Sequence, residues 1–324
     1  MINKISYYVS NNLIPYENLG VEEYLLNRVE ENECILYLWQ NENTVVIGKN
    51  QNAKAEVRIS ALEEEGGYLV RRLSGGGAVY HDKGNLNFTF LVRKKNYDLE
   101  KQCRVILEMA RSFGLDARQT GRNDILIEDG KFSGNAYYNR GDHSYHHGTI
   151  MVNVDINQLG KYLNVSMDKL ESKGVASVKS RVVNLSNFNV DITIEKVKNA
   201  MVKAFEKVYD LPAEIINSKD LDWNQIRQNE ARFASPEWKY GRDFPFSFSK
   251  KNRYTWGGLE VFLDIKAGKI VECEIYSDAM DSSLIEEMKE ALMGREFNNK
   301  SVSEALNMLG NREEINDVIE LLRI

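Results

Sequence analysis

The chain has 324 residues and a formal net charge of -6, from 42 Lys and Arg against 48 Asp and Glu. This acidic balance argues against a nucleic-acid-binding protein, which carries a broad basic face, but it leaves room for a local basic pocket around a small anion. Hydrophobic residues make up 43%, too many for a disordered chain, and the length favours one large and one smaller domain at roughly 150 residues per domain.

The sequence carries no sign of export or of membrane insertion. Residues 1–12 lack the apolar core of a signal peptide, and no stretch approaches the roughly 18 consecutive apolar residues of a membrane span. Cys34, Cys103 and Cys273 lie far apart in apolar stretches with no C-x-x-C spacing, which favours buried, reduced thiols. We therefore expect a cytoplasmic protein that contacts neither membrane nor nucleic acid.

The N-terminal half mixes strand and helix patterns. A helix is predicted at 21–30, and strands at 34–40 and 44–49 are joined by a polar turn. Strands at 67–73 and 86–92 flank a glycine loop, and a helix at 103–113 is closed by Gly114. The helices and strands do not alternate regularly, so an α+β fold with a mostly antiparallel or mixed sheet is predicted.

The second half continues this mixture and then changes. Strands are predicted at 123–138 and 146–156, with turns at 129–130 and 141–142, and an amphipathic helix at 197–208. The stretch 232–249 has two prolines and neither helix nor strand periodicity. A hairpin at 259–276 and helices at 284–294, 302–310 and 313–324 follow. They indicate a small C-terminal domain of strands followed by helices.

The segment "RRLSGGGAVYHDKGN", 71–85, carries the glycine triplet Gly75-Gly76-Gly77. It lacks the G-x-x-x-x-G-K-[ST] pattern of the phosphate-binding P-loop. The dinucleotide fingerprint G-x-G-x-x-G also fails, because Tyr80 occupies the place of its last glycine. Most bare glycine triplets are turns. Arg71 and Arg72 point to alternate faces of a strand, and an arginine on the core side needs an anion. The loop amides could also bind a phosphate or a carboxylate.

Two further stretches contain candidate functional residues. In "GRNDILIEDGKFSGNA", 121–136, Lys131 follows a turn, where a solvated surface lysine is the ordinary interpretation, but the small residues 133–136 would let a ligand approach the backbone. In "HHGT", 146–149, neighbouring histidines lack cysteine or acidic partners at metal-ligand spacing. A histidine that holds a loop by a hydrogen bond is favoured over a zinc site.

Together, in this order and spacing, the three stretches resemble the lipoate-protein ligase family, and the "SPEWKYG" segment near 235 is also similar. The resemblance implies a catalytic domain at 1–246, with the α+β fold of biotin ligases and class II aminoacyl-tRNA synthetases, and an accessory domain at 247–324. Such enzymes join lipoic acid to ATP, release pyrophosphate, and pass the lipoyl group from lipoyl-AMP to a lysine of an acceptor. The acceptors are lipoyl domains of 2-oxoacid dehydrogenase acyltransferase subunits or the glycine-cleavage H protein.

The resemblance also implies roles for individual residues. Lys131 would bridge carboxylate and phosphate oxygens, and Arg72 would help to neutralise the phosphates. Asp124 would bind Mg²⁺ or help to deprotonate the acceptor amine, or else only hydrogen-bond the loop. Arg140 would reach the ligand when a mobile loop at 137–145 closes. The other implied ligand-binding residues are Ser74, Gly75, Gly76, Gly77, Ala78, Val79, Tyr80, His81, Asn123, Gly134 and His147.

Three rival interpretations remain. An octanoyl or lipoyl transferase that forms a thioester needs a cysteine in the pocket, and no cysteine lies in a motif. A biotin ligase would carry a G-R-G-R-x-G-R loop, which is absent. A non-catalytic lipoate sensor on this fold would not need both Lys131 and Asp124, so their presence argues against it.

Overall fold

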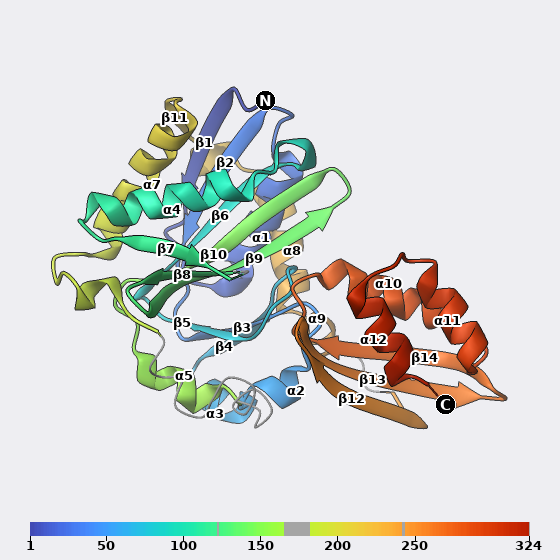
Figure 1. Cartoon of the computed structure of the whole chain (residues 1–324). Coiled ribbons are helices and arrows are strands. Elements are labelled where there is room, and N and C mark those ends of the chain that lie inside the picture. Colours follow the sequence, from blue (N-terminus) through green and yellow to red (C-terminus); the bar gives the residue numbers. More distant parts are fainter. Residues whose placement is uncertain (122, 165–181, 242–243, 324) are drawn as a thin grey trace.

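The structure is a computed structural model that describes residues 1–121, 123–164, 182–241 and 244–323. A larger N-terminal part and a smaller C-terminal part lie side by side (Figure 1). No helix within these ranges is both long enough and apolar enough to cross a membrane.

The N-terminal part is built on an eight-stranded sheet in the order β11-β1-β2-β6-β10-β9-β8-β7. β1 runs parallel to both β11 and β2, and every later neighbour is antiparallel, so the sheet is mixed as predicted. The strands are β1 (Lys4–Val9), β2 (Glu33–Trp39), β6 (Asn85–Arg93), β7 (Ala117–Thr120), β8 (Asp124–Ile127), β9 (Gly130–Arg140), β10 (His143–Met151) and β11 (Ala213–Ile215).

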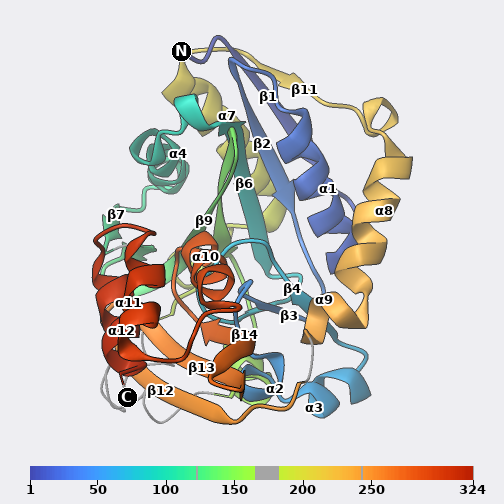
Figure 2. The same ribbon diagram turned by 90° about the vertical axis from the view of Figure 1, so that its right-hand side faces the viewer.

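Helices cover both faces of this sheet (Figure 2). α4 (Leu99–Ser112) and α7 (Ile194–Tyr209) pack on one face, and α1 (Pro15–Arg28) and α8 (Trp223–Ala234) on the other. Because it is covered on both sides, β2 is buried along its whole length, which explains why every residue after Glu33 is apolar. Asp98 caps α4 by accepting from Lys101 N–H, and Thr193 caps α7 in the same way.

A small second sheet carries the glycine loop. β3 (Thr44–Ile47) lies between β4 (Tyr68–Arg71), to which it is parallel, and β5 (Val79–His81), to which it is antiparallel. Around it lie α2 (Ala53–Glu56), α3 (Ile59–Glu64) and α5 (Ile156–Tyr162). Short 3₁₀ turns occur at Lys94–Asn96, Leu185–Asn187 and Ser218–Asp220.

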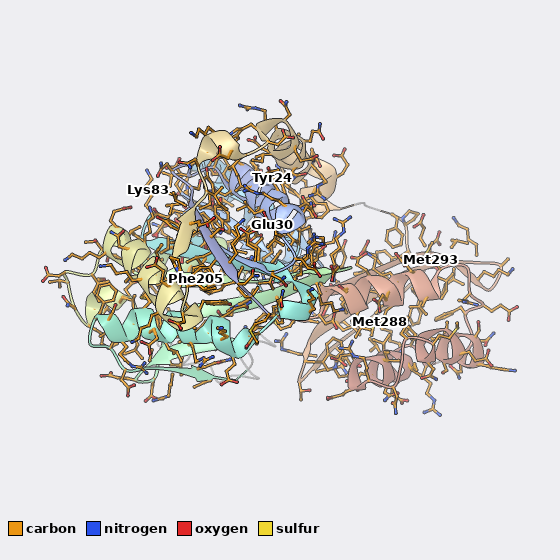
Figure 3. All side chains as sticks on the ribbon, turned by 90° about the horizontal axis from the view of Figure 1, so that it is seen from above. Tyr24, Glu30, Lys83, Phe205, Met288 and Met293 are labelled. Carbon is orange, nitrogen blue, oxygen red and sulfur yellow. The ribbon has the colours of Figure 1, made fainter. Side chains whose placement is uncertain are left out.

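The C-terminal part has its own apolar core. Its antiparallel sheet of β12 (Phe248–Tyr254), β13 (Gly257–Lys266) and β14 (Lys269–Ser277) is followed by α10 (Ser282–Leu292), α11 (Asn299–Asn307) and α12 (Glu313–Leu321). Figure 3 labels two methionines here: Met288 is buried in that core, whereas Met293, just beyond α10, is exposed. The predicted hairpin and the three predicted helices are confirmed.

Three predictions need correction. The first helix begins at Pro15 rather than at 21, because a proline fits the first helical turn. Residues 137–145 are not a mobile loop but the ends of β9 and β10 with a turn between them. The stretch from 232 holds the end of α8, then α9 (Pro236–Tyr240) capped by Ser235, and then the start of β12, while 242–243 lie outside the described residues.

Candidate active site

The glycine triplet lies in the loop between β4 and β5. Two of its glycines fit tightly against the C-terminal part: a Cβ on Gly75 would lie 2.2 Å from the carbonyl oxygen of Ala279, and Gly76, with φ of +87°, donates its N–H to that oxygen at 3.0 Å. A Cβ on Gly77 would meet nothing within 4 Å. Gly77 is therefore the position at which the loop backbone has room for a ligand.

Arg71 and Arg72 are both buried, and their partners are not anions. Arg72 donates to the carbonyl oxygens of Gly75 and Gly77, among others, and Arg71 to carbonyls of the 48–51 turn and of α9. We expected an anion beside a buried arginine, but carbonyl oxygens take its place here. Burial lowers the pKa of Arg72 to about 10, so the side chain stays charged at neutral pH. Arg72 thus holds the shape of the loop.

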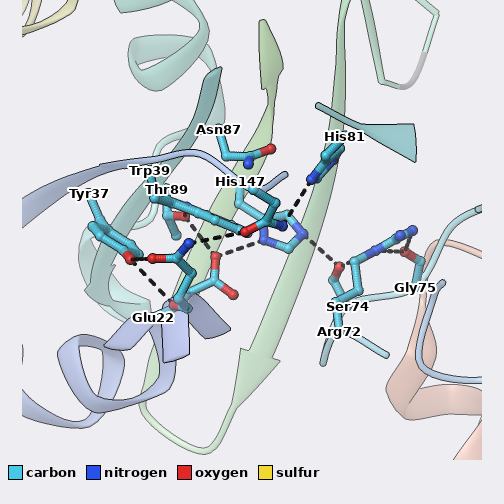
Figure 4. Close-up of polar contacts among 12 residues, drawn as sticks. Glu22, Tyr37, Trp39, Arg72, Ser74, Gly75, His81, Asn87, Thr89 and His147 are labelled. Carbon is cyan, nitrogen blue, oxygen red and sulfur yellow. Dashed lines mark hydrogen bonds and ion pairs between the residues drawn. The ribbon is translucent and has the colours of Figure 1, made fainter. Parts of the chain in front are cut away.

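A chain of buried polar side chains, the polar relay, joins the glycine loop to α1 (Figure 4). Ser74 Oγ lies 2.8 Å from His147 Nε2, and His147 Nδ1 lies 2.8 Å from Glu22 Oε1. The Thr89 hydroxyl also donates to Glu22 Oε1, at 2.7 Å, and Arg72 Nε donates to Ser74 Oγ at 3.1 Å. We assign a proton to His147 Nδ1, because the Glu22 carboxylate can only accept. The prediction that a histidine of this motif holds a loop is confirmed.

Glu22 is the residue that the sequence analysis missed. It is only 1% exposed, on the face of α1 that also buries Leu25 and Leu26. The available signal was an acidic residue three positions before Leu25, on the apolar side of the predicted helix. A carboxylate there must find a partner in the core, and His147 and Thr89 are its partners.

Lys131 and Asp124 form an ion pair, with Nζ 2.6 Å from Oδ1. β8 and β9 shift register between Ile125 and Leu126, so β9 gains one residue and turns Lys131 and Gly134 to the same face. A Cβ on Gly134 would lie 2.9 Å from Nζ, so the glycine makes room for the ammonium. The Lys131 side chain is 30% exposed and paired, which rules out the freely solvated surface lysine.

The two halves of the site meet on β10. His147 and Thr149 are two residues apart in this strand and therefore face the same side of the sheet. His147 binds Ser74 of the glycine loop, while Thr149 Oγ1 accepts the N–H of Gly134 at 3.2 Å. The polar relay and the Lys131–Asp124 pair thus lie over one face of the sheet.

The strand β5, which follows Ala78, lies beside a cavity. Within the described chain it pairs with β3 alone, so its other edge has free backbone groups. Tyr80 lines a cavity of about 1040 Å³ together with Asp82 and Gly84, but Lys131 and Asp124 do not line it. His81 is buried with Nδ1 3.2 Å from Asn41 Nδ2, and burial lowers its pKa to about 3, so the ring is neutral.

Arg140 lies away from the other residues that were predicted to bind the ligand. It ends β9 and lies 3.7 Å from Glu23, which also pairs with Arg232. Six residues of strand separate it from Gly134, about 20 Å at about 3.3 Å per residue. Its strand pairs with β10 up to His143, so the segment that was expected to be a closing loop is a paired hairpin in the structure.

Comparison with known proteins gives matches to both parts of the chain. The model of the lipoyl protein ligase A/B catalytic domain matches residues 14–206, and that of the bacterial lipoate protein ligase C-terminus matches 243–322. The chain is 36% identical to a lipoate-protein ligase A of Bdellovibrio bacteriovorus over 323 residues, covering 97% of this chain and 95% of the relative.

Solved structures agree. The Plasmodium falciparum LipL1 structure with lipoate has a TM-score of 0.87 at 31% identity, covering 98% of both chains. A lipoate-protein ligase A bound with ATP has a TM-score of 0.63 at 25% identity, covering 74% of this chain and 99% of the other. A bipartite lipoate protein ligase of the archaeon Thermoplasma acidophilum, described together with its E2 lipoyl domain, has a TM-score of 0.64 at 27% identity. The match covers 75% of this chain and 99% of the archaeal one. With both parts of the fold matched at these identities, the chain belongs to the lipoate-protein ligase A family, a family of enzymes.

Proposed function

We propose that this enzyme activates lipoate with ATP and transfers the lipoyl group to a lysine of an acceptor protein, with residues 1–246 as the catalytic domain and 247–324 as the accessory domain. The observation that carries the proposal is that the Lys131–Asp124 pair and the polar relay lie over the same face of the sheet. The relatives that bind lipoate or ATP support the same substrates.

In the first step, a carboxylate oxygen of lipoate attacks the α-phosphorus of ATP, and pyrophosphate leaves. The two reactants are anions that repel each other, so a cation must hold both. The compact ammonium of Lys131 would bridge carboxylate and phosphate, and Gly77, at which a Cβ would meet nothing within 4 Å, would lie at the junction of the two ligands. Ser74, held by His147 and Arg72, would line the pocket, and residues 78–81 would wrap the nucleotide with Asn123 facing its phosphates, as in the family that the motifs resemble.

In the second step, the acceptor amine attacks the carbonyl carbon of lipoyl-AMP and AMP leaves. The amine must lose a proton, and the carboxylate of Asp124 is the base beside Lys131. Mg²⁺ would be held by Asp124 together with the ATP phosphates, where it would neutralise phosphate charge. One carboxylate fits this arrangement, because Mg²⁺ commonly uses one or two carboxylates plus substrate phosphates, and no group of three ligating side chains is found among the described residues.

A thioester-forming transferase is less well supported. All three cysteines are buried, and burial raises the pKa of Cys34 to about 12 and that of Cys103 to about 11. Such thiols are poor nucleophiles, and none contacts Lys131 or Ser74 in the structure. Their unpaired state also supports a cytoplasmic location.

The test is pyrophosphate release from ATP and lipoate, followed by mass spectrometry of acceptor proteins. A ligase releases pyrophosphate only when lipoate is present, and adds one lipoyl group to an apo lipoyl domain or apo H protein. A transferase or a sensor releases none, and that result would refute the proposal. The archaeal homologue studied with an E2 lipoyl domain makes such a domain the first acceptor to try.

A further inference from the structure

His146 is a polar residue among aromatic side chains, where an apolar ring such as that of phenylalanine would be expected. It is fully buried, and its ring lies 5.3 Å from that of Phe88, 5.8 Å from Phe90 and 5.4 Å from Tyr137. Burial lowers its pKa to about 3, so it is neutral. Burying an imidazole costs free energy unless it forms hydrogen bonds, so the bonds it forms indicate why it is polar.

The hydrogen bond that the structure gives to His146 is to Asn135, with Nε2 2.8 Å from Oδ1. The orientation of the Asn135 amide is set independently, because its Nδ2 donates to the Asn123 carbonyl at 3.0 Å. Oδ1 is therefore the atom that faces the ring, and His146 Nε2 must carry the proton. Nδ1 has no partner among the described residues, so this one bond accounts for the polarity of the ring.

One backbone carbonyl, that of Asn123, connects this hydrogen bond to the Lys131–Asp124 pair. Asn135 donates twice to the Asn123 carbonyl, from Nδ2 and from its backbone N–H at 2.8 Å. The next residue is Asp124, whose carboxylate holds Lys131. Gly148 makes the arrangement possible, because a Cβ there would lie 3.0 Å from Asn135 Oδ1.

The chain of contacts lies on the opposite face of the sheet from the reacting groups. His146 and Gly148 alternate in β10 with His147 and Thr149, which face the polar relay and Gly134. His146 thus supports Asn123 from behind, where it cannot touch a ligand bound on the other face.

We infer that His146 is a positioning residue: through Asn135 it fixes the Asn123 carbonyl, and with it the Asp124–Lys131 pair. The inference rests on the proposed function only for its kinetic consequence. It assigns to His146 a role distinct from that of its neighbour His147, which holds the glycine loop.

The main test replaces His146 by Phe, which keeps the ring packing and removes the Nε2 donor. We expect kcat for pyrophosphate release to fall about 5- to 10-fold, the worth of one hydrogen bond, while KM for lipoate and for ATP changes less than about twofold. His146→Gln should recover part of kcat, because its amide N–H can donate to Asn135. Phe90→Leu is the matched control: it disturbs the same ring and lowers the melting temperature but should leave kcat unchanged.

Two further measurements separate positioning from stability. The double variant Asn135→Ala/His146→Phe should be no slower than Asn135→Ala alone, because both act through one contact. The NMR signal of the Lys131 ε-methylene, assigned with Lys131→Arg, should shift in His146→Phe and not in Phe90→Leu. A wild-type kcat in His146→Phe, additive effects in the double variant, or an unmoved Lys131 signal would each overturn the inference. If the wild type releases no pyrophosphate, the proposed function fails, and the NMR comparison alone decides the positioning.

Discussion

Gly134→Ala moves the Lys131 ammonium without removing it, and so tests whether its position matters for catalysis. The new Cβ would lie 2.9 Å from Nζ and 3.0 Å from Cε of Lys131. Non-bonded contacts between such atoms need about 3.5 Å or more, so the end of the side chain must shift by roughly 0.6–1 Å. A misplacement of about 1 Å can cost about 10²-fold in rate. We expect lipoate-dependent pyrophosphate release to fall between about 10- and 100-fold.

Stability should not fall with activity. Gly134 does not have the left-handed backbone conformation that disfavours alanine, and the clashing atoms are the flexible end of a lysine. Alanine also restricts the unfolded chain, which stabilises by about 0.4–1 kcal/mol at compatible positions. The melting temperature of the variant should therefore match or exceed that of the wild type.

The control is Gly134→Ala in a variant that already carries Lys131→Ala. In Lys131→Ala, which alone should slow adenylate formation by about 10²–10³, the space beside residue 134 is empty, so adding Gly134→Ala should have no further effect. Wild-type rates in Gly134→Ala would mean that the position of Lys131 seen here is not the productive one. An equal loss in both backgrounds would place the effect in β9 rather than in the ammonium.

Further predictions concern the loop, its contacts and the cysteines. Glu22→Ala removes a charged acceptor from His147 and should lower the free energy of unfolding in urea by about 1.5–3 kcal/mol, whereas Glu22→Gln keeps an acceptor and should cost less; equal losses would contradict the polar relay. Gly75→Ala should part the loop from Ala279 and enlarge the radius of gyration in X-ray scattering, and an unchanged curve would count against that contact. Because burial raises their thiol pKa values, the three cysteines should react with a thiol reagent at pH 8 only after the protein unfolds. A cysteine that reacts quickly in the folded protein would instead favour the thioester-forming transferase.

The sequence predicts best where one local pattern determines both structure and chemistry. The strands at 123–138 and 146–156 and the turns beside them were found because turn residues interrupt clear apolar runs. The turn and the small residues around Lys131 made it a candidate, but its role came from the resemblance to the family, because the local pattern alone favoured a surface lysine. The turn at 141–142 was predicted, but the ends of the two strands beside it were taken for a mobile loop, because Asn139, Arg140 and Asp142 hide the alternation, although hydrogen bonds between β9 and β10 extend as far as Arg140.

Partners that are distant in the chain were not predictable. The sequence indicated a buried arginine after β4, but the carbonyls that receive its hydrogen bonds depend on how the loop folds back on Arg72. Glu22 and His147 are separated by 125 residues, and only the packing of α1 on the sheet brings them together. Similarly, the contact of Gly75 with Ala279 joins the two parts of the chain.

The four residues of the HHGT motif illustrate both limits. In sequence, two adjacent histidines indicate a metal site or a loop contact, and only the resemblance to the family distinguishes His147 from His146. In the strand they point to opposite faces: His147 with Thr149 toward the glycine loop and Gly134, and His146 with Gly148 toward Asn135. His147 therefore contacts the glycine loop, whereas the contacts of the other three residues converge on Gly134 and Asn135 of β9. Substitutions within this one strand should accordingly separate into effects on substrate binding, from His147, and effects on the chemical step, from His146.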